Sequence, residues 1–218
     1  MSRDPQPVRE NLHGQALGRK GAETRQRLMD ATRALLRQQG PVGLTALQIA
    51  KQAGTSGPTF YLYFGDTEDV LLALSEAACQ DTDDVVASLS GPWPENTLPQ
   101  HCRDFIDAFY RYWNRHREVL NFRNFRSDLG DERFDLVRQR SAIPIVHAIS
   151  RRVQAAQAAG TMDSRTAMAR SVIIYAAIER LATRIASGRF LTDDINAEDL
   201  YRAEADILVM LFSRHSPP

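Results

Sequence analysis

Apolar residues recur every three or four positions along most of this sequence, which is the spacing that places them on one face of an α-helix. The first such segment runs from about Ala22 to Gln39, and Gly40-Pro41 ends it. No segment shows the alternation of apolar and polar residues that is typical of a half-buried strand. The pattern predicts an all-α fold.

Two shorter helices follow the first one. Thr45 and Gln48 have the spacing of a capping box, in which each side chain satisfies a free backbone N–H at the start of a helix. Gly54 can end that helix in the left-handed conformation that other residues avoid. Ser56 is suited to cap the second short helix, and Pro58 falls in its first turn, where a missing N–H costs little.

The second short helix has two faces. Phe60 and Phe64 lie four residues apart, so both can pack inward, while Thr59, Tyr61 and Tyr63 stay available outside. Helix, glycine turn and helix is the arrangement that places a recognition helix in the major groove of DNA. The two short helices therefore predict a helix-turn-helix.

A second, larger helical region follows. Asp66 is suited to cap its first helix, and Pro144 is expected to break or kink a later one because a mid-helix proline clashes with the carbonyl four residues back. The loop Gly91-Pro92-Trp93-Pro94 interrupts the region. The other helices are expected over about 98–115, 119–128, 131–159 (with Gly160 after its end), 164–187 and 197–212, the last capped by Asn196.

The segment from about Ala22 to Leu74 resembles the DNA-binding domain of the TetR family of one-component transcriptional regulators. The rest of the chain is similar to that family only in length and helical layout. The residues that carry the resemblance follow a first amphipathic helix; they are Leu44-Thr45, Ile49-Ala50, Ala53-Gly54, Ser56, Thr59, Phe60-Tyr61, Phe64 and Glu68 to Leu71.

The resemblance implies three parts. Residues 1–20 are expected to be a flexible arm, which either touches DNA or has no role. Residues 21–66 are the expected helix-turn-helix DNA-binding domain, and residues 67–218 the expected ligand-binding and dimerisation domain. One position departs from the family: Thr67 stands where a lysine thought to reach a DNA phosphate is usual, which puts one backbone contact in doubt.

The charge distribution supports a DNA-binding amino end. The whole chain carries 27 basic and 27 acidic residues, so its formal net charge is zero. Residues 1–60, however, carry nine basic and four acidic residues, which leaves the remainder negative. A basic end on an acidic body is either a solvated basic face or the electrostatic footprint of a domain that meets phosphates, and its coincidence with the helix-turn-helix favours DNA.

The predicted recognition helix has few side chains that read bases strongly. Between Ser56 and Phe64 there is no Arg, Asn or Gln, so the bidentate pairs with guanine or adenine are absent. Thr59 can bond a base or a phosphate, and the apolar surface of Pro58 and Leu62 can meet thymine methyl groups. The residues better suited to phosphates are Tyr61, Tyr63, Thr45 and Ser56. We therefore expect phosphate contacts and DNA shape to contribute alongside base edges. The predicted DNA-binding residues are Arg25, Thr45, Lys51, Ser56, Pro58, Thr59, Tyr61 and Tyr63.

Aromatic residues in the carboxy-terminal region suggest a ligand site. Helical bundles build such sites from facing side chains, although an aromatic stripe at helical spacing is also what a packed core requires. Aromatic walls favour a hydrophobic or planar effector, and Arg123 and Arg126 are either partners for an anionic head group or solvated arginines. The predicted ligand-binding residues are Phe105, Phe109, Trp113, Phe122, Phe125 and Tyr175.

The last two helices carry apolar residues around more of their circumference than one core face requires. They are either central helices of a monomer or, as the resemblance implies, the halves of a two-fold four-helix interface. In the second case two recognition helices lie about 34–36 Å apart and read a palindromic operator. We expect a homodimer through these helices.

Motifs for other chemistries are absent from the sequence. It has no glycine-rich phosphate loop, no His-Glu-x-x-His and no Gly-x-Ser-x-Gly, and its five histidines share no metal-ligand spacing, so we expect no enzyme, no metal and no cofactor. Cys79 and Cys102 are expected to be buried free thiols. No apolar run approaches the roughly 20 residues of a membrane span, and the amino end has no signal-peptide core, so we expect a cytoplasmic protein without a membrane partner.

These observations predict a ligand-responsive transcriptional regulator, more specifically a repressor, that binds a palindromic operator as a homodimer and is released by a small hydrophobic effector. The alternatives are a helical small-molecule-binding protein that has lost DNA binding, for which Thr67 is the hint, and a helical enzyme.

Overall fold

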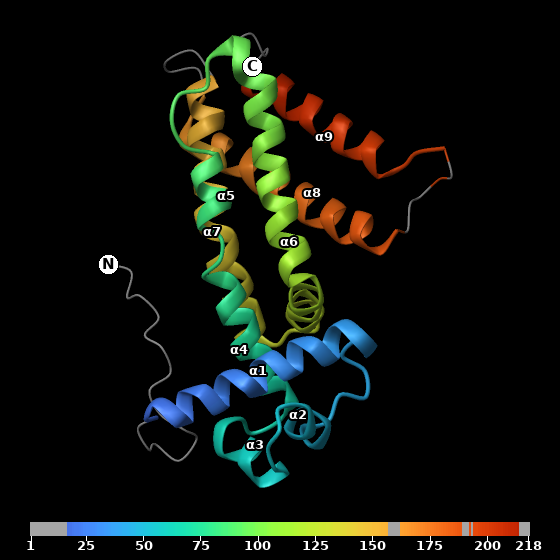
Figure 1. Cartoon of the computed structure of the whole chain (residues 1–218). Coiled ribbons are helices and arrows are strands. Elements are labelled where there is room, and N and C mark those ends of the chain that lie inside the picture. Colours follow the sequence, from blue (N-terminus) through green and yellow to red (C-terminus); the bar gives the residue numbers. More distant parts are fainter. Residues whose placement is uncertain (1–16, 157–161, 189–191, 193, 214–218) are drawn as a thin grey trace. The chain divides into compact units, whose positions relative to one another are not determined.

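The computed structural model of the chain describes residues 17–156, 162–188, 192 and 194–213 (Figure 1). Within these ranges the regular structure is helical and contains no strand, which confirms the predicted all-α fold. The elements are α1 (Arg19–Gln39), α2 (Ala46–Gln52), α3 (Gly57–Tyr63), α4 (Thr67–Cys79), α5 (Asp83–Ser88), the 3-10 helix η1 (Glu95–Thr97), α6 (Leu98–Asp128), α7 (Glu132–Ala156), α8 (Ser164–Ser187) and α9 (Ala197–Phe212).

The chain divides into two compact units. The first unit comprises residues 1–77 and 118–135, and the second comprises residues 78–117 and 136–218. The boundary between them therefore falls within α4, α6 and α7. The first unit is larger than the predicted DNA-binding domain 21–66, because the start of α4, the end of α6 and the start of α7 pack with the helix-turn-helix.

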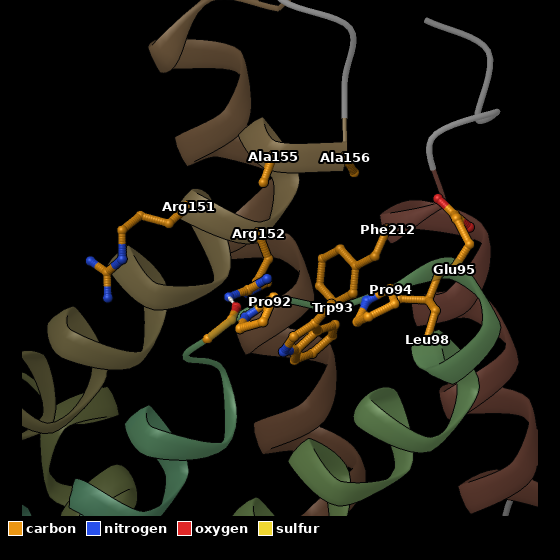
Figure 2. A pocket seen from close by; sticks show the side chains of 11 residues that line it. Pro92, Trp93, Pro94, Glu95, Leu98, Arg151, Arg152, Ala155, Ala156 and Phe212 are labelled. Carbon is orange, nitrogen blue, oxygen red and sulfur yellow. Dashed lines mark hydrogen bonds between the residues drawn. The ribbon is translucent and has the colours of Figure 1, made fainter.

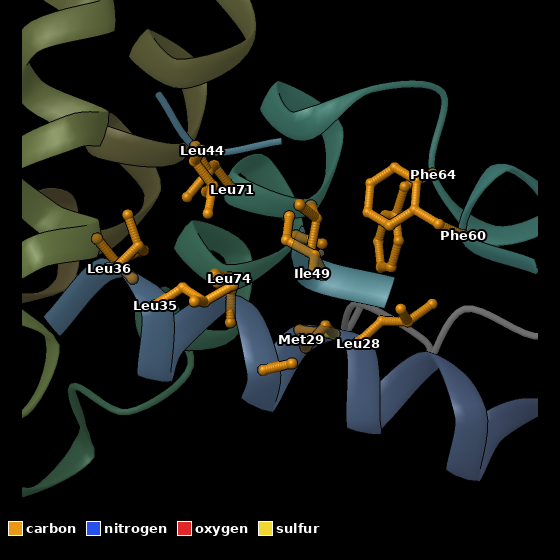
Figure 3. Close-up of a cluster of buried hydrophobic side chains, with 14 of the residues drawn as sticks. Leu28, Met29, Leu35, Leu36, Leu44, Ile49, Phe60, Phe64, Leu71 and Leu74 are labelled. Atoms are coloured by element: carbon orange, nitrogen blue, oxygen red, sulfur yellow. The ribbon is translucent and has the colours of Figure 1, made fainter. Parts of the chain in front are cut away.

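The core of the first unit forms where α1, α2, α3 and α4 turn their apolar faces toward one another (Figure 3). Leu28, Ile49 and Phe60 have no exposed surface, and Val119 and Phe134 bring α6 and α7 into the same cluster. Because α2 and α3 have only seven residues each, neither is stable as an isolated helix, so this packing is what holds them.

Several helix boundaries differ from the sequence prediction. Helix α6 is continuous over 98–128, where two helices were expected, because no glycine or proline lies between Pro99 and Gly130. Helix α7 continues through Pro144. Pro144 and Arg140, whose carbonyl loses its helical donor, are both exposed, so water can satisfy that carbonyl. The expected end of this helix at Gly160 lies outside the described residues.

Helix ends follow the capping rules. Asn196 and Asp199 form a capping box at the start of α9, as expected, and Asp163 accepts hydrogen bonds from two backbone N–H groups at the start of α8. Asp66 Oδ1 accepts from the backbone N–H of Asp69 at 2.8 Å, so the predicted cap of α4 is present. These caps satisfy backbone donors that the helices leave free.

The second unit buries polar groups between its helices. Arg138 on α7 donates to Glu179 on α8 at 2.8 Å, and the Glu179 side chain is almost fully buried. On α9 the inward residues include Ala205, Leu208 and Glu204. The Tyr110 hydroxyl on α6 donates to Glu204 Oε2 at 3.0 Å, while Glu204 Oε1 is buried and has no hydrogen-bond partner among the described residues.

Burial raises the pKa of Glu204 from 4.5 to about 7, against the opposing effect of the Tyr110 hydrogen bond. The folded protein therefore holds a proton that the unfolded chain releases near pH 4.5. The stability that this proton contributes is complete below pH 4.5 and is lost as the pH rises through 7.

Glu204→Gln is expected to remove this pH dependence because the amide stays neutral. The free energy of unfolding is compared at pH 5 and at pH 8.5. Its decrease between these two pH values should be about 3 kcal/mol smaller in the variant than in the original protein. Urea denaturation at the two pH values measures this difference, with Asp206→Asn, at an exposed position of α9, as the control. Equal pH dependence in the Gln variant and the original protein would contradict a buried, protonated Glu204.

Candidate nucleic-acid interface

Helix α2 begins at the predicted capping box. The backbone N–H of Gln48 donates to Thr45 Oγ1 at 3.2 Å, and the backbone N–H of Thr45 donates to Gln48 Oε1 at 2.9 Å. The Thr45 hydroxyl also donates to Gln48 Oε1 at 3.0 Å, so in this arrangement its proton is already used. Gly54 follows α2 with a φ of 67°, the left-handed conformation that the turn requires.

Helix α3 begins at Ser56. The backbone N–H of Thr59 donates to Ser56 Oγ at 3.3 Å, and the two side-chain hydroxyls lie 2.8 Å apart. When Ser56 donates to Thr59 in that pair, the Thr59 hydroxyl keeps its own proton for an acceptor outside the protein. The geometry therefore leaves one hydroxyl donor of the pair for a base or a phosphate.

The aromatic residues of this region separate into inner and outer positions, as the spacing predicts. Phe60 and Phe64 are buried, with ring centroids 5.7 Å apart. Tyr61 is 54% exposed. Tyr63 is half-buried against the core, and its hydroxyl lies 3.7 Å from the place where a β-carbon on Gly21 would stand. The Tyr63 hydroxyl is thus held next to the first turns of α1.

The cationic residues predicted for this interface differ in accessibility. Lys51, in the last turn of α2, is exposed. Arg25 is half-buried: its guanidinium lies 5.0 Å from the centroid of the Phe64 ring and contacts Met29 Sδ. Burial lowers the pKa of Arg25, an effect that the charge of Glu76 opposes. Arg25 therefore braces α1 against Phe64 in this structure.

The start of α1 adds basic residues that the sequence analysis assigned to the arm. Arg19 and Lys20 belong to α1, and both are exposed, as is Arg27. A shallow depression of the surface is lined by Lys20, Glu23, Thr24, Gln26 and Arg27. Residues 1–16 of the expected arm lie outside the described residues.

Leu47 does not lie where its sequence spacing predicts. The three-residue spacing predicts that Leu47 and Ala50 share one face of the helix, but Ala50 is fully buried whereas Leu47 is 71% exposed. The core contacts of so short a helix are made by Ile49 and Ala50, and Leu47 points away from them. A helix of seven residues is too short for the spacing of its apolar residues to show which of them face the core.

An ion-pair network within the first unit joins three segments that are distant in sequence. Arg126 on α6 pairs with Glu68 on α4 at 2.9 Å and with Asp131 at 3.0 Å. Arg133 on α7 pairs with Asp131 at 3.0 Å and with Asp69 at 3.4 Å. Hydrogen bonds from Arg133 and Arg126 hold the pKa of Asp131 well below its usual range. We refer to these five residues as the α4 network.

The interpretation of Arg123 and Arg126 as solvated arginines is wrong for this structure. Arg126 is committed to the α4 network, and Arg123 is almost fully buried, with hydrogen bonds to Asn124 Oδ1 at 2.9 and 3.0 Å. Neither is a solvated surface arginine. The pairing of Arg126 with Glu68, which is distant in sequence, leaves no local pattern along the chain that would have identified it.

The six predicted ligand-binding aromatics are distributed over both units. Phe105, Phe109, Trp113 and Tyr175 are buried in the second unit, where the Phe109 ring stacks on Trp113 and meets Tyr175 edge-on. In the first unit, Phe122 packs against Phe134 in the core, and Phe125 is 58% exposed. Within the second unit these ring contacts join Phe109, Trp113 and Tyr175. Trp113 Nε1 is buried without a hydrogen-bond partner among the described residues.

A cavity of about 570 Å³ in the second unit is lined by other residues (Figure 2). Trp93 is at its centre, stacked on His101 and meeting Phe212 edge-on. The Arg152 guanidinium lies 4.8 Å from the centroid of the Trp93 ring and donates to the carbonyls of Leu89 and Gly91. The other residues that line the cavity are Pro92, Pro94, Glu95, Leu98, Arg151, Ala155 and Ala156.

Other chemical groups have no assembled site. Within the described ranges no three His, Cys, Asp or Glu residues are placed to hold a metal ion. Cys102 is buried, which raises the pKa of its thiol to about 12, and Cys79 is only half-buried. None of the helices in the described part of the chain is long and apolar enough to cross a membrane.

The fold and this site define a class of protein: an all-α chain with a capped helix-turn-helix whose second helix presents hydroxyl and aromatic side chains to the outside. The description "Bacterial regulatory proteins, tetR family" matches residues 28–74, and "Tetracyclin repressor-like, C-terminal domain" matches residues 84–211. Because the second match covers more than half of the chain, the protein belongs to the TetR family.

Individual relatives share little sequence identity with this chain. The HTH-type transcriptional regulator EthR of Mycobacterium tuberculosis is 28% identical over 107 residues, which are 49% of this chain and 50% of EthR. The chain thus matches about half the length of that relative. Fatty acid degradation regulator FadR from Bacillus halodurans has a TM-score of 0.62 at 15% identity, with 91% of this chain and 97% of FadR covered.

A TetR family transcription regulator from Marinobacter aquaeolei has a TM-score of 0.56 at 21% identity, with 87% of this chain and 96% of that chain covered. At such low identities, both structural likenesses establish the fold alone.

Tyr63→Phe is expected to weaken binding to every DNA sequence by a similar factor, about tenfold, because the lost hydroxyl is assigned to a phosphate rather than to a base. Titrations against a panel of duplexes with single base-pair changes measure this. Tyr201→Phe, which removes a hydroxyl from α9, is the matched control. A loss confined to a few base positions would contradict the phosphate assignment.

Proposed function

We propose that the protein is a ligand-responsive repressor that binds a palindromic operator as a homodimer and is released by a small hydrophobic effector. The observation that carries the proposal is the helix-turn-helix itself, whose α3 is anchored by Phe60 and presents Thr59 and Tyr61 outward. Exposed basic residues at the start of α1 and the end of α2 supply charge for phosphates. The proposal keeps all the predicted DNA-binding residues, and it gives Arg25 an indirect role because its guanidinium packs against the Phe64 ring.

Dimerisation is assigned to α8 and α9. Both helices bury one face within the second unit, yet their other faces carry large apolar side chains that are exposed. Ile173 on α8 and Met210 on α9 are 69% and 70% exposed, and Val172 and Ile207 are also exposed. Apolar patches of this kind are typical of interaction surfaces, and a two-fold pairing of the two helices covers both at once.

The effector is assigned to the aromatic cluster of the second unit formed by Phe109, Trp113 and Tyr175, with Phe105 buried one helical turn before Phe109. The unpartnered N–H of Trp113 gives this apolar cluster one buried donor. A buried donor without an acceptor is costly, so a planar apolar ligand that carries one acceptor gains a hydrogen bond there. Phe122 and Phe125 belong to the first unit and are not needed for this cluster.

Release follows if the effector prefers a conformation in which α4 moves the DNA-binding heads to a spacing that does not fit adjacent major grooves. The α4 network supports this route, because it ties Glu68 and Asp69 in the first turn of α4 to the end of α6 and the start of α7. Each of these helices continues into the second unit. Binding of the effector and of the operator must then be linked reciprocally. If the effector lowers the affinity for the operator by a given factor, saturating operator must lower the affinity for the effector by the same factor.

A mobility-shift titration tests the DNA-binding dimer. Duplexes selected by the original protein from a random pool should lose roughly 10³-fold or more in affinity between 50 and 200 mM salt. Ile173→Asp should be monomeric in sedimentation and should lose about 10²-fold or more in operator affinity, because its heads are no longer linked.

Leu129→Asp places the same charge at an exposed apolar position of the first unit and should stay dimeric. If no duplex is retained at low salt, the result favours the alternative of a helical ligand-binding protein without DNA affinity. If a bound small molecule is turned over, the result favours an enzyme.

The two tryptophans separate the two candidate effector sites. Nitrobenzene is a planar apolar probe whose nitro group accepts hydrogen bonds and whose contact quenches indole fluorescence. Trp93→Phe, which keeps Trp113, should show saturable quenching, whereas Trp113→Phe, which keeps Trp93, should show only a linear collisional response. Circular dichroism checks that both variants stay helical. Saturable quenching confined to Trp93 would move the effector site to the cavity of Figure 2.

A further inference from the structure

The outer face of the helix-turn-helix carries more apolar surface than its core explains. On α3, Leu62 is 42% exposed and Pro58 is exposed as well. On α2, Leu47 is exposed, and its Cδ1 lies 4.0 Å from the place where a β-carbon on Gly57 would stand. Leu47 therefore lies next to the first turn of α3, and the exposed apolar residues of the two helices belong to one region of the first unit.

Packing does not account for these positions. The inward face of α3 is already supplied by Phe60, which has no exposed surface, and by Phe64 immediately after the helix. A single exposed leucine is ordinary, but here nearly every outward position of a seven-residue helix is apolar or aromatic. Thr59 is the exception, and it shares a hydrogen bond with Ser56.

The chemistry of the major groove identifies what such a surface recognises. Base edges there present hydrogen-bond donors and acceptors, and thymine alone adds an apolar group, its C5-methyl. With no Arg, Asn or Gln on α3, the side chains that pair with guanine and adenine are missing. The basic surroundings of the helix-turn-helix fit DNA rather than a protein partner with an apolar face.

We infer that Leu62 and Pro58, with Leu47 at the edge, recognise thymine methyl groups, so that each half-site is specified mainly by the positions of its thymines. The inference rests on the proposed function, because it concerns the operator that the recognition helix reads. Burying one methyl group contributes roughly fourfold in affinity, or about sixteenfold for the same contact in both half-sites of a palindrome.

Replacing thymine by deoxyuridine tests the inference, because it removes the methyl group and leaves every hydrogen-bonding group in place. The full-length protein first selects duplexes from a random pool, and the tightest duplex is then synthesised with deoxyuridine at one symmetric pair of positions at a time. At two or more pairs within the half-sites, the dissociation constant should rise roughly sixteenfold. The same replacement in the flanks should change it less than twofold.

Leu62→Ala provides the residue-level test. It should bind the thymine duplex more weakly than the original protein does and should no longer distinguish thymine from deoxyuridine at one pair of positions, which a double-mutant cycle measures. Leu47→Ala should act likewise at a different pair, and Leu129→Ala, at an exposed position outside the helix-turn-helix, should leave the discrimination intact. Circular dichroism confirms that each variant is folded.

The outcomes separate this inference from the proposed function. Salt-sensitive binding that is indifferent to deoxyuridine at every position overturns thymine recognition and leaves the DNA-binding regulator intact. Selected half-sites without a recurrent thymine also overturn it. If no duplex is retained at low salt, the proposed function itself fails.

Discussion

Insertion of Phe60 into the core of the first unit is the contact on which the DNA-binding head depends. Helix α3 has seven residues, too few to persist in water by hydrogen bonding alone, so its existence and orientation follow from what it buries. Phe60 has no exposed surface, and Phe64 extends the same anchor to the residue after the helix. Because both rings come from one face, Thr59, Tyr61 and Leu62 are turned outward together.

The anchor also explains why α1 does more than carry a basic surface. Leu28 of α1 lies beside Phe60 and Phe64 in the core (Figure 3), and the Arg25 guanidinium lies over the Phe64 ring. A cation over an aromatic face is attracted by the ring's charge distribution, and it gains more when it is partly desolvated. Arg25, one of the predicted DNA-binding residues, therefore also stabilises the core that supports α3.

The α4 network gives the first turn of α4 a set of partners that no local interaction supplies. Glu68 and Asp69 would favour this end of the helix anyway through the dipole. Their pairing with Arg126 and Arg133 connects that end to α6 and α7, two helices that belong largely to the second unit. Thr67 opens the same turn. If the proposed function is correct, a change of charge in this turn is expected to alter both DNA affinity and its regulation.

Local patterns in the sequence were sufficient for the elements whose causes are local. The capping box of Thr45, the cap at Ser56, the glycine turn at Gly54 and the inward pair Phe60 and Phe64 were all predicted, because each depends on residues within four positions of one another. Tertiary packing decided the rest. It left Leu47 and Phe125 exposed, made α6 continuous and buried Arg123. Those outcomes depend on which distant segments meet, and a helical repeat of apolar residues records that a face is buried without recording what buries it.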